Sequence, residues 1–172
     1  PGAFDKVLDI NKCWLQDDIC NEIRLCVKDY AKRNGLSFYD IRNNQGLMRT
    51  MVVRISGKGE IMLTVVLGED NPDVINALMT AILEKFSNIT SLYYVINTKH
   101  NDTLNDLPFH LFHGKPYIEE EMDGLTFRVG PKSFYQTNSK QAYKLYSVAR
   151  EMAQLTGNET AYDLYTGTGT IA

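Results

Sequence analysis

Residues 47–69 contain two β-forming segments joined by a glycine-rich turn. The segments LMRTMVVRI (47–55) and EIMLTVVLGE (60–69) are rich in Val, Ile, Met and Thr, and the link between them is SGKG. Such side chains fit a pleated sheet, and glycine permits the positive φ angles of a tight turn. The pattern predicts an antiparallel hairpin. An isolated hairpin is only marginally stable in water, so the chain must supply further strands or helices to cover it.

Amphipathic helices are predicted on both sides of this hairpin. Segment 16–35 carries apolar residues at helical spacing and stops at Gly35. Segment 71–88 has Asn71 as a candidate N-cap and Pro72 at the first helical position, where the missing N–H costs nothing. Both helices can therefore place an apolar stripe on one face of a sheet.

Strands are predicted at KVLDI (6–10) and SLYYVINT (91–98). Together these segments give the order strand–helix–strand–strand–helix–strand, which is that of a ferredoxin-like α+β sandwich. We assign residues 1–100 to this central α+β domain. The polar, turn-rich residues 101–116 are expected to be a connector.

A different pattern follows the connector. Segment 116–130 predicts two short strands around Asp123-Gly124, and segment 139–157 predicts a helix with Ser139 as N-cap. The short strand TAYDLY (160–165) then leads into the turn TGTGTIA. A strand, a glycine-rich turn and the start of a helix are typical of the opening of a Rossmann-like α/β domain, so residues 117–172 are expected to begin one.

Composition sets broad limits on function. The chain of 172 residues is 44% hydrophobic, which is ordinary for a globular protein, and carries a net charge of −3. Proteins that bind nucleic acid through phosphates are usually basic, so bulk charge gives that partner no support. Three cysteines form no disulfide framework and indicate a reduced, cytoplasmic setting. The sequence contains no signal peptide and no long apolar run, and both ends are expected to be cut ends of a longer protein.

The glycine turn at the end of the sequence suggests a ligand site. Gly167 and Gly169 allow the backbone to approach a ligand without an intervening Cβ, and Asp163 lies at the carboxyl end of the predicted strand. The turn lacks G-K-[ST], which excludes a P-loop. Because a lone G-x-G is a weak signal, a plain strand-to-helix turn remains the alternative.

A second candidate site is GPKSFYQTN (130–138). Gln136 and Asn138 can hydrogen-bond the polar edge of a ligand, while Phe134 and Tyr135 can pack against a flat ring. The alternative is a capped helix entry with aromatic packing.

The two segments, about 25 residues apart, together resemble the RumA/TrmA family of S-adenosylmethionine-dependent RNA uracil-C5 methyltransferases. The family carries an F-x-Q-x-N segment before the first helix of its methyltransferase domain and D-L-[FY]-x-G-x-G as its first cofactor motif. The segments DINKCWLQ, GLMRTMVVR and LFHGKPYIEEEMDG are similar to its central domain. The resemblance implies a central domain followed by the N-terminal, truncated part of a methyltransferase domain.

The resemblance also implies site residues. The cofactor S-adenosylmethionine is expected to contact Gln136, Tyr165, Gly167, Gly169 and Thr170. RNA is the implied partner, with ribosomal RNA of the 23S type favoured by the form of the Gln136 segment, and neither DNA nor a membrane is expected.

The family's chemistry uses a cysteine nucleophile and a general base that come from the far end of the methyltransferase domain. We therefore assign no catalytic residue and expect this chain to be inactive by itself. Cys13, in a D-x-x-x-C context, matches the fourth ligand of the iron–sulfur (4Fe-4S) cluster found in several family members. A cluster would need further cysteines, so Cys13 is a candidate ligand only in a longer protein, and a buried small side chain is the alternative.

Charged side chains leave two further questions open. Arg42, Arg49, Arg54 and Lys58 lie on or beside the first hairpin and can form either an RNA-facing patch or a solvated surface. The acidic run 119–121 is expected to be a solvated strand edge. Two other functions stay open: a Rossmann-like methyltransferase with another substrate, and a non-catalytic RNA-binding module on an α+β sandwich.

Overall fold

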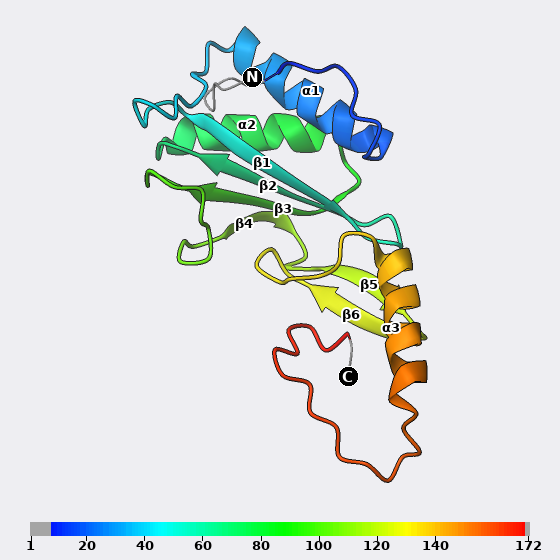
Figure 1. Cartoon of the computed structure of the whole chain (residues 1–172). Coiled ribbons are helices and arrows are strands. Elements are labelled where there is room, and N and C mark those ends of the chain that lie inside the picture. Colours follow the sequence, from blue (N-terminus) through cyan, green and yellow to red (C-terminus); the bar gives the residue numbers. More distant parts are fainter. Residues whose placement is uncertain (1–7, 171–172) are drawn as a thin grey trace.

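The computed structural model describes residues 8–170, which form a four-stranded sheet with two helices, a separate two-stranded hairpin and a third helix (Figure 1). None of the helices in this range is long and apolar enough to cross a membrane. The α+β class predicted from the sequence is confirmed. The elements in chain order are α1 (Asp18–Arg33), β1 (Met48–Ile55), β2 (Ile61–Leu67), α2 (Pro72–Lys85), β3 (Ile89–Ile96), β4 (His110–Gly114), β5 (Ile118–Met122), β6 (Leu125–Val129) and α3 (Ser139–Ala153).

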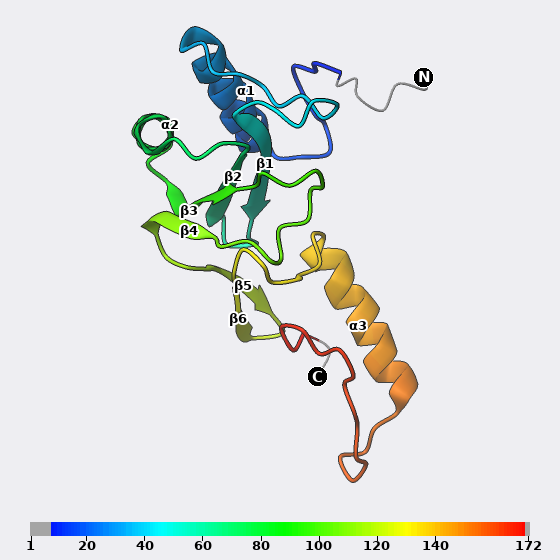
Figure 2. The same cartoon turned by 90° about the vertical axis from the view of Figure 1, so that its left-hand side faces the viewer.

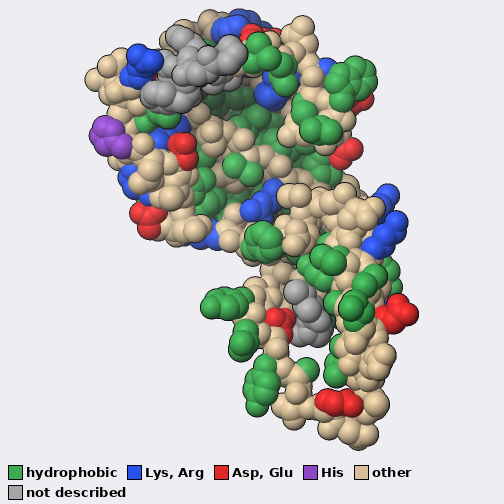
Figure 3. All heavy atoms as spheres, viewed as in Figure 1, with side chains coloured by type: hydrophobic (Ala, Val, Ile, Leu, Met, Phe, Trp, Pro, Cys, Tyr) green, Lys and Arg blue, Asp and Glu red, His purple; other side chains and the backbone are tan. Residues whose placement is uncertain are grey.

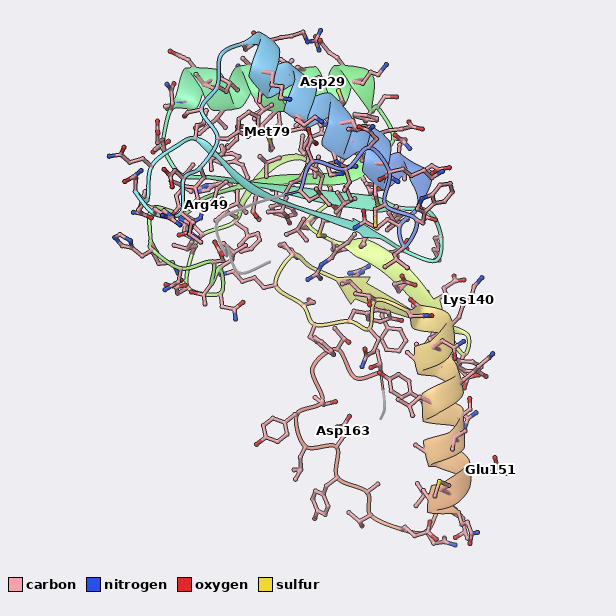
Figure 4. All side chains as sticks on the ribbon, turned by 45° about the horizontal axis from the view of Figure 1, so that its top comes forward. Asp29, Arg49, Met79, Lys140, Glu151 and Asp163 are labelled. Atoms are coloured by element: carbon pink, nitrogen blue, oxygen red, sulfur yellow. The ribbon has the colours of Figure 1, made fainter. Side chains whose placement is uncertain are left out.

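Both α1 and α2 cover the same face of the four-stranded sheet, as the side view in Figure 2 shows. The predicted cap of α2 is confirmed, since the Asn71 side chain accepts a hydrogen bond from the Val74 N–H at 3.3 Å. The side chains of Ile23, Leu63 and Leu78 are fully buried between the helices and the sheet. Met79 of α2, labelled in Figure 4, lies in the same layer. Apolar stripes at helical spacing thus supply the main core, as the sequence predicted.

The opposite face of the sheet is also covered. Met62 and Tyr93 of the sheet form a second apolar cluster with Ile118 and Val129 of the β5–β6 hairpin. The Ser91 hydroxyl donates to the backbone carbonyls of Lys115 and Tyr117, at 2.7 and 3.0 Å, which fixes the chain as it enters the hairpin. Because both faces are covered, every residue of β2 is buried.

The strand order differs from the ferredoxin-like arrangement. The sheet runs β1-β2-β3-β4, with β2 and β3 parallel and directly paired through the α2 crossover. A ferredoxin-like sheet would place the predicted N-terminal strand between them. Of that segment, residues 6–7 lie outside the described residues, and residues 8–10 are not in a strand. The fourth place is taken at the edge by β4, which lies within the expected connector and pairs antiparallel with β3.

The C-terminal part departs further from expectation. The predicted strand 160–165 has no strand conformation, and among residues 8–170 no strand pairs with it. Backbone groups that find no ladder partner turn to water or to side chains, and the segment runs as an exposed coil from the end of α3 back towards β6 (Figure 1). The helix itself forms as predicted, although its N-cap is Asn138 and not Ser139: the Asn138 side chain accepts from the Gln141 N–H at 3.1 Å.

Candidate functional site

The glycine turn adopts the backbone that its sequence requires. Tyr165, Gly167 and Gly169 all have positive φ angles, of 71°, 56° and 77°. The Gly169 N–H donates to the Thr166 carbonyl at 2.8 Å, and the Thr166 hydroxyl donates to the Asp163 carboxylate at 2.9 Å. The region around Gly169 is open, since a Cβ there would have no atom within 4 Å. The turn therefore leaves room for a ligand to approach its backbone.

Beside this turn lies a cavity of about 510 Å³. Thr170 and Asp163 line it from the turn, Tyr146 from α3 and Phe127 from the β5–β6 hairpin. Figure 3 shows the hollow between the C-terminal segment and α3, with apolar side chains around it. A pocket of this size is within the range of about 300–1,000 Å³ that holds cofactors and small ligands. The apolar walls suit a flat ring, while Asp163 and Thr170 offer hydrogen-bond partners.

One wall of this cavity is fixed by an ion pair. The Arg150 guanidinium donates to the Asp123 carboxylate at 2.9 Å, and the Tyr143 hydroxyl donates to the same carboxylate at 3.2 Å. The Arg150 hydrogen bond and the Tyr143 hydroxyl together lower the pKa of Asp123. These contacts connect α3 to the turn of the β5–β6 hairpin, and both of these elements line the cavity.

Gln136 does not share this cavity. It lines a second cavity, of about 610 Å³, together with Trp14, Arg54 and Phe134. Of the five residues expected to contact the cofactor, the structure therefore brings the three non-glycine ones to different places: Thr170 lines the first cavity, Gln136 the second, and the Tyr165 side chain is fully exposed. Asp163, labelled in Figure 4, lies on the C-terminal segment well away from the central domain.

The loop that carries Gln136 is held by the central sheet. Arg54 of β1 donates through Nη1 to the backbone carbonyls of Gly130 and Ser133, at 3.3 and 2.7 Å. Within the loop, the Gly130 N–H donates to the Ser133 hydroxyl at 3.1 Å. Burial lowers the pKa of the Arg54 guanidinium. Arg54 thus acts as a bridge between the two parts of the chain.

The basic side chains of the first hairpin do not gather into an RNA-facing patch. Arg49 has a side chain only 2% exposed and pairs with Asp102, while Lys58 lies 2.7 Å from the Glu121 carboxylate. Arg54 is committed to backbone carbonyls, as described above. The Arg49 side chain is buried, so the patch interpretation is wrong for Arg49, while Arg54 and Lys58 have acceptors within the chain.

The expectation of a solvated acidic edge is wrong for Glu120. This residue is only 5% exposed, although Glu121 beside it is exposed. Its Oε1 accepts from the Gly57 N–H at 2.9 Å, which links the β1–β2 turn to β5. The alternation of side chains along β5 could have predicted the burial of Glu120, because Ile118 and Met122 face the same buried side.

Cys13 lies in the segment that precedes α1, in a half-exposed position. The Asn21 side chain holds its backbone, accepting from the Cys13 N–H at 2.8 Å and donating to its carbonyl at 3.2 Å. Across residues 8–170, no group of three or more His, Cys, Asp or Glu side chains comes together to hold a metal ion. The described donor set therefore does not fit an iron–sulfur cluster, which needs about four ligands.

The turn that follows α3 contains a strongly perturbed carboxylate. Glu159 accepts hydrogen bonds from the Thr156 hydroxyl and N–H, both at 2.8 Å, and from the Gly157 N–H at 3.1 Å. These bonds, with that from the Thr156 side chain first, lower the pKa of Glu159 from 4.5 to about 2. Since the folded pKa is depressed, the contribution to stability is present above pH 4.5 and is lost as the pH falls through about 2.

We expect carboxyl-detected NMR titration to show Glu159 with a midpoint near pH 2. The Thr156→Val variant removes the hydroxyl donor but keeps the side-chain shape, and should raise this midpoint. A wild-type midpoint near the ordinary value of 4.5 would show that the turn does not persist in solution.

Comparison with known proteins gives clear relatives. A scan against protein-family models found no match. An RNA methyltransferase of Bacteroides thetaiotaomicron, named as uncharacterized, is 57% identical over 175 residues, and one of Porphyromonas gingivalis is 55% identical over 174. Each alignment covers 100% of this chain but only 38% and 37% of the relative. A Staphylococcus aureus protein with the same description is 37% identical across 96% of the chain.

A solved structure has the same fold. The tRNA (uracil-54, C5)-methyltransferase of Pyrococcus abyssi, in complex with S-adenosyl-L-homocysteine, superposes with a TM-score of 0.75 at 28% identity, covering 98% of this chain and 40% of that one. The chain is thus a homologue of part of RNA methyltransferases. The resemblance to the RumA/TrmA family is confirmed, and the chain spans about two fifths of the length of the proteins it matches.

Proposed function

We propose that this chain is part of an RNA uracil-C5 methyltransferase that uses S-adenosylmethionine. The chain contributes the central α+β domain and the first cofactor-binding turn. The observation that carries the proposal is the glycine turn, in which Gly167 and Gly169 have positive φ angles and whose neighbours Asp163 and Thr170 line a cavity. The structural neighbour's complex with S-adenosyl-L-homocysteine supports a cofactor of this class.

The residues at the turn fit such a cofactor in chemical type. The Asp163 carboxylate can accept from an amino or hydroxyl group, and the Thr170 hydroxyl can donate or accept. The glycines place no side chain between the backbone and a ligand, and the apolar side chains of α3 and β6 can cover an adenine ring. When bound, S-adenosylmethionine supplies an activated methyl group. Gln136 lines the other cavity, so its proposed contact with the cofactor would need the loop 130–138 to approach the turn.

The substrate is proposed to be RNA, and ribosomal RNA of the 23S type in particular. The relatives are named as RNA methyltransferases, which supports RNA as the substrate class. The preference for ribosomal RNA comes from the F-Y-Q-T-N form of the segment 134–138 alone, whereas the solved neighbour acts on tRNA. Catalytic groups are proposed to lie outside the 172 residues, and an iron–sulfur cluster that includes Cys13 is supported by nothing in residues 8–170.

The test is methyl transfer by a longer protein that contains this chain. Tritiated S-adenosylmethionine and separated ribosomal and transfer RNA are the substrates, and mass spectrometry of the digested RNA identifies the product. The proposal expects 5-methyluridine, with ribosomal RNA as the better substrate. Methylation of tRNA alone would refute the ribosomal preference, and a methyl group at any other position would refute the reaction.

A further inference from the structure

Side chains alternate between partly buried and exposed along the segment 133–136, which leads into α3. Ser133 and Tyr135 are partly buried, whereas Phe134 and Gln136 are exposed. This alternation is typical of an extended backbone, in which successive side chains point to opposite sides. The Tyr135 ring packs against the second apolar cluster, so its two neighbours are turned away from that cluster. The direction of the Gln136 side chain therefore depends on how firmly the backbone of this segment is held.

The segment supplies little of that hold by itself. Within residues 8–170, residues 134–137 make no hydrogen bond to the rest of the chain, and the Tyr135 hydroxyl is buried without a partner. Backbone without such bonds is free to move unless its surroundings fix it. The packing of the Tyr135 ring and the contacts at the two ends of the segment must therefore fix its position.

Arg54 holds the first end. Residues 130–133 form a turn that is closed by a hydrogen bond from the Ser133 N–H to the Gly130 carbonyl at 3.1 Å. Arg54, near the end of β1, donates through Nη1 to the carbonyls of Gly130 and Ser133, at 3.3 and 2.7 Å. The Arg54 side chain is partly buried, so water competes less for these two charge-assisted bonds.

Glu120 holds the second end. The hydroxyl of Ser139, the first residue of α3, donates to Oε1 of Glu120 at 3.4 Å. The same oxygen accepts from the N–H of Gly57, in the turn between β1 and β2, at 2.9 Å. Both ends of the segment are thus connected to one end of the β1–β2 hairpin. Because the Ser139 bond is long, Arg54 provides the stronger of the two connections.

We propose that Arg54 is a positioning residue for cofactor binding, which holds the turn 130–133 and thereby fixes the direction in which Gln136 points. The inference rests on the proposed function, since that function takes Gln136 as a contact of S-adenosylmethionine. It gives the central domain a part in cofactor binding through a side chain that does not itself touch the cofactor. Arg54 should therefore act on cofactor affinity only through Gln136.

The hold on the segment is tested by NMR on the 172-residue chain. Backbone order parameters of residues 134–137 are expected to be about 0.85, the value of a rigid backbone, although Phe134 and Gln136 are exposed. Arg54→Met keeps an apolar stem but has no donor, so these values should fall below about 0.6 while those of β2 stay unchanged. In Arg54→Lys the ammonium nitrogen ends one bond short of Nη1, and intermediate values are expected.

A matched control separates this effect from the loss of a positive charge. Arg128 lies on β6, close in sequence to the turn, and its exposed guanidinium lies 4.7 Å from the centre of the Tyr117 ring. Arg128→Met removes the same charge and should leave the order parameters of residues 134–137 unchanged.

The action through Gln136 is tested by titration calorimetry on a longer protein that contains this chain. Arg54→Met and Gln136→Ala are each expected to weaken S-adenosylmethionine binding about tenfold, as the loss of one hydrogen bond would give. The double variant should bind no more weakly than Gln136→Ala alone, because two residues that act through one contact are not additive. A merely structural role of Arg54 would lower the number of binding sites, since some molecules would be unfolded, and would not change the affinity of the folded ones.

Three results would overturn the inference. These are order parameters in Arg54→Met equal to those of the wild type, an unchanged affinity in Arg54→Met, and a double variant whose loss equals the product of the two single losses. Should Arg54→Met fail to fold, Arg54→Lys takes its place in both measurements. If the wild-type longer protein does not bind S-adenosylmethionine at all, the proposed function is refuted, and the NMR measurement still decides whether Arg54 holds the segment.

Discussion

Replacing Gly114 by alanine is expected to cost far more stability than the same change at Gly59. The two glycines have nearly equal φ angles, 83° and 81°, so an alanine is strained at both by about 1–2 kcal/mol. At Gly114, however, a Cβ would lie only 2.0 Å from the backbone oxygen of Thr90, whereas at Gly59 it would meet nothing within 4 Å. The neighbour is backbone of β3 and cannot rotate away.

The clash should add about 1–3 kcal/mol for Gly114→Ala, because overpacking forces the backbone to shift. The Lys115 N–H also donates to this Thr90 oxygen at 2.9 Å, and the shift would weaken that bond. Urea unfolding of the two variants is the measurement, with Gly59→Ala as the matched control for strain. Equal losses would mean that β4 moves aside without cost and that its place at the sheet edge is loosely determined.

The second large effect is expected for Arg49→Met. Arg49, labelled in Figure 4, donates through Nη1 to the carbonyls of Asn97 and Lys99, at 2.7 and 2.6 Å, and through Nη2 to that of Asn101 at 2.8 Å. Its guanidinium also stacks 4.1 Å from the centre of the Tyr39 ring. Methionine keeps the apolar stem but removes the donor of the Asn97 and Lys99 carbonyls, while the Asn101 carbonyl keeps the Asn97 amide as a donor at 3.0 Å.

Loss of these bonds should destabilise the protein by about 3–5 kcal/mol, since hydrogen bonds to a charged group are worth about 1.5–3 kcal/mol each and are not additive. The ion pair with Asp102 is not the main contribution, because the Asp102 side chain is 75% exposed. Asp102→Asn is therefore the control and should cost less than about 1 kcal/mol. Hydrogen exchange in the loop 97–106 should accelerate in Arg49→Met only. Comparable losses in the two variants would show that the ion pair, and not the carbonyl bonds, holds this loop.

Periodicity predicted the elements that bury a continuous apolar face. The hairpin 47–69 and the helices α1 and α2 follow from local patterns that packing reinforces, and they occur as expected. The order of the strands could not be predicted with the same success. The short run KVLDI has a strand-like alternation, yet its described residues 8–10 pair with no strand, whereas HLFHG, with two histidines, forms β4 through pairing with β3. Which edge a short segment joins depends on tertiary contacts.

The candidate site, like the fold, was predicted only in part. Glycines at 167 and 169 were predicted from the turn chemistry and do adopt positive φ angles. Glu120 was missed because three consecutive carboxylates suggested a solvated edge, although one of them faces the interior. In the structure, Gln136 and Thr170 line separate cavities. The spacing of the two motifs along the sequence does not show whether their residues meet in space.

The order of the strands in the main sheet has a consequence for synthesis. Because β1, β2, β3 and β4 lie side by side in the order in which they occur in the chain, each strand that leaves the ribosome can pair with the one made just before it. The crossover helix α2 is complete before β3 emerges, so the parallel pair closes over a helix that is already available. Contacts between near neighbours in the chain cost little loop entropy and favour rapid folding. Each strand of this sheet therefore waits only for the next strand in the chain, and none waits for a partner made later than that.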